Sequence, residues 1–491
     1  MPIMHRVSWA GFVAGPLLAL LLYQWLPGAE AGGLAPAGRA TAAIGAWMAV
    51  WWMTEAIPLA ATALLPVVLF PLLEVLPAAQ ALRPYASDTV FLFMGGFMIG
   101  LAMQRWCLHT RIALRIVRLV GTAPARLVAG FMLATAALSL WISNTAAAVM
   151  LLPVGLSTLE LVRRHVEMED PVIATAVRNF GTCLMLGIAY GASIGGLGTL
   201  IGSPPNLVLA NYARAELGIE ITMLDWMRIG IPLVAVLLPL TWLYLTRWLF
   251  PLHLEVPSAA REEIHDELGR LGPMQRGERV VLALFTCTAL GWIFRPQLVA
   301  ITGLGGLTDT SIAMAGALAL FLIPVDWRRR VFALDWETAQ KLPWGILLLF
   351  GGGLSLAAAI SANGVDAWLA SGFSGLSGVR TLWVLLGATA LVIFLTELSS
   401  NTAVANTFIP ILAAAAIGLG LDPMPVLFAA ALAATCAFML PVATPPNAIV
   451  FSSGLVSIGQ MMRAGLGLNL IAIVAIALAI RVLGSWPLPA W

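Results

Sequence analysis

Long apolar runs follow one another from one end of the chain to the other, separated by short polar segments. A run of about 20 apolar residues is long enough to cross the hydrocarbon core of a bilayer as a helix. Polar residues interrupt four of the segments. The pattern predicts uninterrupted spans at 7–26, 41–57, 59–77, 88–105, 228–250, 279–295, 309–324, 343–361 and 464–484, and interrupted segments at 121–163, 174–212, 379–418 and 424–455.

The interruptions carry the same two motifs twice. Ser-Asn-Thr stands at 143–145 and again at 400–402, and Pro-Pro-Asn stands at 204–206 and again at 445–447. Irregular polar backbone is tolerated at membrane depth only where protein or a water-filled cavity covers it. One pair of motifs in each half of the chain, in the same order, predicts the internal repeats and broken helices of a secondary transporter.

Segments 121–163 and 379–418 each consist of two short apolar arms around Ser-Asn-Thr. Each is either a pair of short transmembrane helices or a re-entrant hairpin with the motif at its tip. Short arms and polar tips favour two hairpins, beside about 11 crossings and a cytoplasmic N-terminus. Most of the 26 lysines and arginines then face the cytoplasm, although counting each hairpin as two crossings gives the same loop sides. The hairpin mouths fall on opposite sides, which predicts an inverted repeat.

Composition supports a membrane class. The 491 residues are 60% hydrophobic and 10% charged, whereas a soluble protein carries roughly 25% charged residues. The first apolar run is too long for the core of a signal peptide and lacks a small-residue cleavage site, so we expect it to be retained. We therefore expect an all-α, multi-pass protein of the inner (plasma) membrane in contact with lipid, with no nucleic-acid partner. The four cysteines have no metal spacing.

The two motifs have suitable chemistry for binding a cation and an anion together. Hydroxyls, amide oxygens and freed backbone carbonyls are ligands for hard cations, whereas backbone N–H groups at a helix N-terminus favour an anion. An asparagine amide offers both an acceptor and a donor. No lysine or arginine lies near either tip, so desolvation would strongly disfavour a dianion unless cations bound with it. This arrangement predicts an anion coupled to Na+.

Three stretches carry a resemblance to a known family: WWMTEAIPLAATALLP (51–66), FLFMGGFMIGLAMQRWCLHTRIAL (91–114) and SSNTAVANTFIPIL (399–412). They resemble the divalent anion/Na+ symporter family, which includes INDY-type dicarboxylate and citrate transporters. The likeness covers nearly the whole chain. It implies a homodimer, Na+ as coupling ion without other cofactors, and an elevator-type mechanism in which a fixed scaffold domain carries a mobile transport domain.

The resemblance also implies domain boundaries and site residues at the matching motif positions. Scaffold helices would occupy 1–120 and, with cytoplasmic loops, 213–362; the transport domain would comprise 121–212 and 363–455; a last helix would occupy 456–491. The first Na+ site would use Ser139, Ser143, Asn144 and Gly202, and the second would use Thr396, Ser399, Asn401 and Ala443. The substrate would contact Asn144, Thr145, Ser203, Asn401, Thr402, Thr444 and Pro445.

We expect a Na+-coupled importer of C4-dicarboxylates such as succinate, fumarate or malate. The alternatives on the same fold are a Na+-independent dicarboxylate exchanger and a symporter of citrate or sulfate. A channel would not explain hairpins that open to opposite sides, and the histidines fall on the predicted cytoplasmic side, away from any buried serine nucleophile. We therefore expect no enzyme. Glu397 either binds a third cation or proton or caps backbone N–H groups, and we favour capping.

Overall fold

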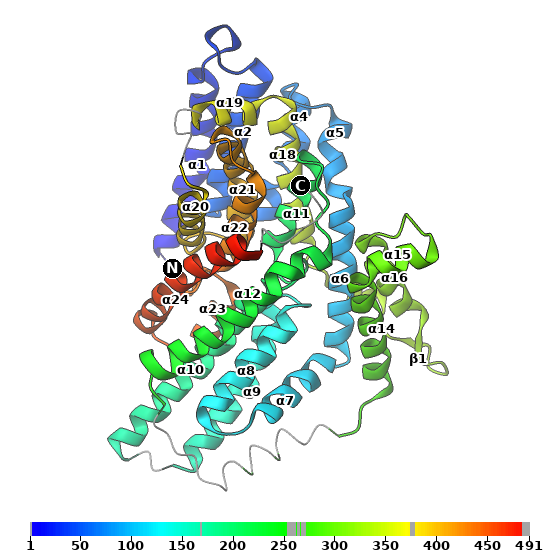
Figure 1. The fold of residues 1–491 in the computed structure, drawn as a ribbon, viewed down its shortest axis with the longest axis vertical. Helices are drawn as coiled ribbons and strands as arrows, with labels where there is room; N and C mark the ends of the chain where they lie inside the picture. Colours follow the sequence, from blue (N-terminus) through cyan, green and yellow to red (C-terminus); the bar gives the residue numbers. More distant parts are fainter. Residues whose placement is uncertain are drawn as a thin grey trace.

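The computed structural model describes residues 2–166, 169–252, 262, 266, 272–373 and 379–483, and these are mostly helical (Figure 1). Most of the predicted cytoplasmic loop after residue 250 lies outside the described residues. The main helices are α1 (Pro2–Trp25), α2 (Pro36–Thr54), α3 (Leu59–Thr62), α4 (Leu65–Leu72), α5 (Ala78–Leu82), α6 (Asp88–Arg105), α7 (Leu108–Val120), α8 (Pro124–Ser139), α9 (Asn144–Arg164), α10 (Pro171–Gly195), α11 (Pro204–Glu216), α12 (Met223–Leu243), α14 (Arg276–Ile293), α15 (Arg295–Thr302), α16 (Asp309–Leu322), α17 (Trp336–Ala339), α18 (Trp344–Ala362), α19 (Val365–Phe373), α20 (Thr381–Thr396), α21 (Asn401–Gly418), α22 (Pro423–Thr435), α23 (Pro445–Phe451) and α24 (Ile458–Leu483).

Short elements complete the described fold. The 3₁₀ turns η1 (Ala29–Ala31) and η2 (Arg83–Ala86) precede α2 and α6, and a π-helical turn, η3 (Tyr244–Leu249), extends α12. Strands β1 (Pro324–Asp326) and β2 (Val331–Phe332) form an antiparallel pair after α16. In Figure 1 this pair lies at one side of the molecule with α14, α15 and α16.

Seven helices among the described residues are long and apolar enough to cross a membrane, or eight if α14 and α15, bent by 80°, form one span. The expectation of an all-α polytopic membrane protein is thereby confirmed. Several expected spans are shorter apolar helices, so the count of about 11 crossings stays a prediction. The expected span 59–77 is divided between α3 and α4. Pro66 stands in the first turn of α4, where the missing N–H of proline is not needed by the helix.

Both Ser-Asn-Thr segments form helical hairpins. α8 ends at Ser139 and α9 begins at Asn144, whereas α20 ends at Thr396 and α21 begins at Asn401. The α8–α9 hairpin occupies the lower half of Figure 1 and the α20–α21 hairpin the upper half. The motif therefore stands at the turn of each hairpin, as the sequence predicts.

Both Pro-Pro-Asn segments follow a break in a helix. Irregular backbone separates α10 from α11 at 196–203 and α22 from α23 at 436–444. Prolines occupy the first turn of α11 and of α23, because a helix start does not need their missing N–H groups. The short helices pack on the opposite halves: α11 contacts α21 and α22, and α23 contacts α9 and α10.

Helix α7 is an element that apolar runs alone did not indicate. It is strongly amphipathic, and its arginines leave no uninterrupted apolar run in this segment. Arg111 is only 5% exposed, and its Nε donates to Glu278 Oε2 at 2.7 Å. This buried ion pair ties α7 to the start of α14, and removal of one partner would leave an uncompensated buried charge.

Candidate functional site

The first hairpin turn brings a hydroxyl and an amide together. Ser139, the last residue of α8, is fully buried, and its Oγ donates to Asn144 Oδ1 at 2.6 Å. Ser143 is the N-cap of α9, and its Oγ accepts a hydrogen bond from the Ala146 N–H at 3.3 Å. The cap satisfies one of the free N–H groups at the helix start. A buried Ser–Asn pair therefore stands at the tip.

The first helix break lies directly against this tip. A Cβ added at Gly196 would lie 2.6 Å from Asn144 Oδ1, and one added at Gly202 would lie 3.0 Å from the Ser139 carbonyl oxygen. Both glycines therefore allow a close approach of backbone to tip. The hydroxyl of Thr199 also donates to the carbonyl of Leu140 in the hairpin turn. The structure thus gathers Ser139, Asn144 and Gly202, three of the four residues expected at the first Na+ site.

The second hairpin repeats the hydroxyl–amide pair. Thr396 Oγ1 lies 2.8 Å from Asn401 Oδ1, to which it donates, and 2.9 Å from the carbonyl oxygen of Ala434 on α22. Thr396 is fully buried, as is Ser139 at the matching position. Thr396 stands where the first half has Ser139, and the threonine keeps the hydroxyl contact, so the two tips have the same local chemistry.

An asparagine closes each helix break in the same way. Asn206 Nδ2 donates to the carbonyls of Gly196 and Thr199, both at 2.8 Å. Asn447 Nδ2 donates to the carbonyls of Ala437 and Leu440 at 3.1 and 3.0 Å. In both cases the acceptors stand ten and seven residues earlier. Sequence reasoning placed these asparagines in the motif but gave them no role; their recurrence at matched positions was the available signal.

The two asparagines also share an unsatisfied atom. Both side chains are fully buried, and neither Asn206 Oδ1 nor Asn447 Oδ1 has a hydrogen-bond partner within the described structure. A buried amide oxygen without a donor is costly unless water or an ion satisfies it. Each break therefore retains one free buried acceptor.

Direct contacts join the two halves near the breaks. Ser203, the N-cap of α11, lies 2.8 Å from Thr435 Oγ1 at the end of α22, hydroxyl to hydroxyl. Tyr190 Oη on α10 donates to the carbonyl of Phe438 at 2.8 Å. Thr444, the N-cap of α23, accepts the Asn447 N–H at 3.3 Å. The N-terminus of α11 and the second helix break are thus each held by a group from the other repeat, whereas Thr444 caps α23 within its own repeat.

Glu397 caps the second break. Its carboxylate accepts the backbone N–H groups of Phe438, Met439 and Leu440 at 2.7 to 3.1 Å. The side-chain amide of Asn469 adds a donor at 2.8 Å. Glu397 is 3% exposed, and these donors hold its carboxylate oxygens. The geometry agrees with the favoured interpretation, a carboxylate that caps freed N–H groups.

Some expected site residues are not brought into these clusters by their side chains. Ser399 Oγ donates to the carbonyl of Trp52 on α2 at 3.4 Å, away from the Thr396–Asn401 pair. Thr145 and Pro445 are exposed, whereas Thr402 and Ala443 are buried.

No group of three histidine, cysteine, aspartate or glutamate side chains suited to a metal ion occurs among the described residues. The gathered oxygens are neutral hydroxyls, amides and carbonyls.

A membrane-embedded helical chain whose halves repeat a hairpin and a broken helix belongs to the class of secondary transporters. The particular family follows from comparison with known proteins: the chain matches the model for the sodium:sulfate symporter transmembrane region over residues 8–488, and it belongs to this family. The resemblance seen in the sequence is thereby confirmed, and the protein is a transporter rather than an enzyme.

Two similar curated proteins carry a more specific name. The sodium-dependent dicarboxylate transporter SdcS of Staphylococcus aureus (strain USA300) is 42% identical over 476 residues, 96% of this chain and 90% of that protein. SdcS of Staphylococcus saprophyticus is 42% identical over 479 residues, again 96% and 90%.

Two solved structures share the fold at low sequence identity. The Alcanivorax borkumensis YdaH transporter superposes with a TM-score of 0.57 at 15% identity, covering 90% of this chain and 98% of that chain. Neisseria gonorrhoeae MtrF gives a TM-score of 0.53 at 12% identity, covering 86% and 85%. These likenesses support the fold class.

Proposed function

We propose that this protein imports C4-dicarboxylates such as succinate, fumarate or malate into the cell together with Na+. The observation that carries the proposal is the repeated hydroxyl–amide pair, Ser139 with Asn144 and Thr396 with Asn401, each at a hairpin tip. The similar SdcS proteins are named sodium-dependent dicarboxylate transporters, which supports the choice of cargo and coupling ion.

The oxygens near each tip suit Na+. In the first half, Ser139, Asn144 and the backbone at Gly202 lie together, with Ser143 beside them at the cap. A cation between Ser139 Oγ and Asn144 Oδ1 would take the place of the hydrogen bond that now joins them. The serine hydroxyl would keep its proton but rotate it away, so that both oxygens turned lone pairs toward the cation. The second site would use Thr396, Ser399, Asn401 and Ala443, with Ser399 contributing through its backbone.

The amide oxygens of Asn206 and Asn447 are a second indication that each half of the protein suits a cation. Each is buried without a donor, so each half contains an acceptor that a cation or its water could satisfy. Two matched acceptors, one per repeat, support one cation near each tip. Neutral ligands hold Na+ without excluding an anion from the same neighbourhood, whereas carboxylate ligands would repel it.

The dicarboxylate would bind between the two tips. The amides of Asn144 and Asn401 would donate to its carboxylates, Thr145 and Thr402 would add hydroxyls, and the N-terminal ends of α11 and α23 would add N–H groups beside Ser203, Thr444 and Pro445. Helix N-termini favour negative charge. Because the motifs contain no lysine or arginine, Na+ would supply the compensating charge, and the substrate would bind poorly alone.

Movement would follow the elevator scheme that the family resemblance implies. The transport domain would consist of 121–212 and 363–455, moving against scaffold helices in 1–120 and 213–362, within a homodimer whose N-termini are cytoplasmic. The contacts of α11 with α21 and of α23 with α9 support a single moving unit, because each hairpin packs on a helix of the other repeat.

Succinate uptake into proteoliposomes, with an inward Na+ gradient against a matched K+ gradient and no internal substrate, tests the proposal. Na+-dependent accumulation is expected. Uptake only after preloading with dicarboxylate, and indifferent to Na+, would identify an exchanger and overturn the coupling. Na+-dependent uptake of citrate or sulfate but not succinate would keep the coupling and overturn the cargo.

A further inference from the structure

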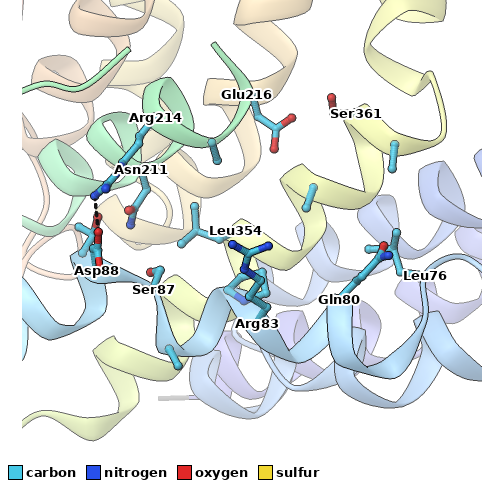
Figure 2. Close-up of a pocket in the computed structure, with 16 residues that line it drawn as sticks. Leu76, Gln80, Arg83, Ser87, Asp88, Asn211, Arg214, Glu216, Leu354 and Ser361 are labelled. Carbon is cyan, nitrogen blue, oxygen red and sulfur yellow. Dashed lines mark ion pairs between the residues drawn. The ribbon is translucent and has the colours of Figure 1, made fainter. Parts of the chain in front are cut away.

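A cavity of about 750 Å³ lies at the C-terminal end of α11 (Figure 2). Its wall comes from five elements: α5, η2, the start of α6, the end of α11 and the C-terminal half of α18. Gln80, Arg83 and Arg214 in this wall are exposed, so the cavity opens at the surface. Charge in the neighbouring loops predicts that this surface is the external one.

Two hydrogen-bond donors in the wall have no partner within the described structure. Asn211 is 4% exposed, and its Nδ2 is buried without an acceptor. Arg83 forms no ion pair or hydrogen bond with the described residues. Figure 2 shows Arg83 on η2 and Asn211 on α11, on facing walls of the cavity. A buried amide donor and a free guanidinium in one cavity are the groups that a carboxylate would satisfy.

The wall also contains two acidic side chains, Asp88 and Glu216. Asp88 Oδ2 accepts a hydrogen bond from Arg214 Nη1 at 2.7 Å. The Asp88–Arg214 pair is neutral as a unit. Arg83 and Glu216 lie on different walls of the cavity (Figure 2), and among the described residues Arg83 is the basic side chain of this wall that has no ion-pair partner.

We propose that this cavity is an outer binding site for a small carboxylate anion, held by Arg83 and Asn211 before it reaches the hairpin tips. The inference rests on the proposed function. Helix α11 connects the two places, because Ser203 caps its N-terminus and Asn211 stands eight residues further along, about 12 Å away at the rise of an α-helix. An anion captured here would be concentrated beside the central site.

Initial rates of succinate uptake by the full-length protein in proteoliposomes test the outer site. The variants are Arg83→Gln, Arg83→Glu and Asn211→Leu, and the matched control is Arg380→Gln, an exposed arginine at the start of α20 outside this cavity. At low salt, Arg83→Gln is expected to raise KM by roughly threefold, the size of an exposed ion pair, and Arg83→Glu to raise it further. The maximal rate should stay unchanged.

Ionic strength distinguishes the contribution of the Arg83 charge from that of the Asn211 hydrogen bond. The effect of Arg83→Gln should shrink at high ionic strength, because exposed charges are screened, whereas that of Asn211→Leu should persist, since a neutral hydrogen bond is not screened. Chromatographic elution and melting of each variant in detergent report folding.

The outcomes separate this inference from the proposed function. Wild-type protein that takes up no succinate, with or without Na+, overturns the proposed function. Wild-type uptake with unchanged KM in both Arg83→Glu and Asn211→Leu overturns the outer site alone. An equal rise of KM in Arg380→Gln would assign the effect to general surface charge and also overturn the site.

Discussion

The carboxylate of Glu397 accepts a hydrogen bond from the side-chain amide of Asn469 at 2.8 Å, which ties the second hairpin tip to α24. The first half has Leu140 at the matching position, and there the hydroxyl of Thr199 bonds to the Leu140 backbone instead. The two repeats therefore connect the hairpin tip to the helix break through different contacts: a carboxylate in the second repeat and a threonine hydroxyl in the first. The carboxylate of Glu397 accepts hydrogen bonds from several buried donors. If it were removed, each donor left without an acceptor would destabilise the protein.

Replacing Glu397 with Gln should lower stability more than it alters coupling. The amide keeps one acceptor but turns an NH2 group toward backbone N–H donors, which is expected to cost about 1–3 kcal/mol. Thermal unfolding in detergent measures the loss, and Asn469→Leu, which removes a single donor, should lose less. A change in the number of coupled cations or in the pH dependence of uptake, with normal stability, would instead support a cation or proton at Glu397.

Asn144→Ala and Asn401→Ala should each reduce uptake to background. Each truncation removes the amide oxygen that pairs with Ser139 or Thr396 and the amide donor proposed for the substrate, so cation and anion binding should fail together. Asn179→Ala, at an asparagine far from both tips, should transport normally. Wild-type uptake in either tip variant would contradict a site shared between cation and anion.

Gly202→Ala should abolish Na+-dependent uptake. The added Cβ would lie 2.7 Å from the Gly196 carbonyl oxygen and 3.0 Å from that of Ser139, so the break would have to move away from the tip. The matched control is Ala443→Gly, which removes a Cβ at the equivalent position and should reduce uptake far less. Measurement of Na+ activation curves for both variants decides the point; an unaffected Gly202→Ala curve would place the first cation elsewhere.

Asn206→Leu and Asn447→Leu should raise the Na+ concentration needed for half-maximal uptake. Each loses two hydrogen bonds to the carbonyls of its break, worth about 0.6 kcal/mol each on average within a membrane. Asn206→Asp, which keeps the size but not the donors, separates lost hydrogen bonds from altered packing. Activation by Na+ that matches wild type in all three variants would show that the asparagines are not positioning residues.

Apolar run length and local motifs account for most of what could be predicted. Helix α6 occupies residues 88–105 as expected, and both Ser-Asn-Thr motifs stand at hairpin turns, because apolar length and polar interruptions are local properties of the chain. The Ser139–Asn144 contact also lies within five residues and could be anticipated from the motif.

Contacts between distant residues could not be predicted in this way. The Ser203–Thr435 contact joins residues more than two hundred positions apart, and no periodicity in either segment indicates its partner. Nothing in the sequence around Arg111 indicates its burial against Glu278, which is 167 positions away. The side chain of Ser399 turns to α2 because the neighbouring helix offers a carbonyl, which the motif alone does not reveal.

The packing of α23 against α9 has a consequence for synthesis of the protein. About 280 residues separate the end of α9 from the start of α23, and a ribosome that adds about 5–20 residues per second needs roughly 15 to 55 s to make them. During that interval the first hairpin is already made, but the helix that packs on it does not exist. The surface of α9 that α23 covers must therefore be shielded by the insertion machinery or by earlier helices until the last part of the chain arrives.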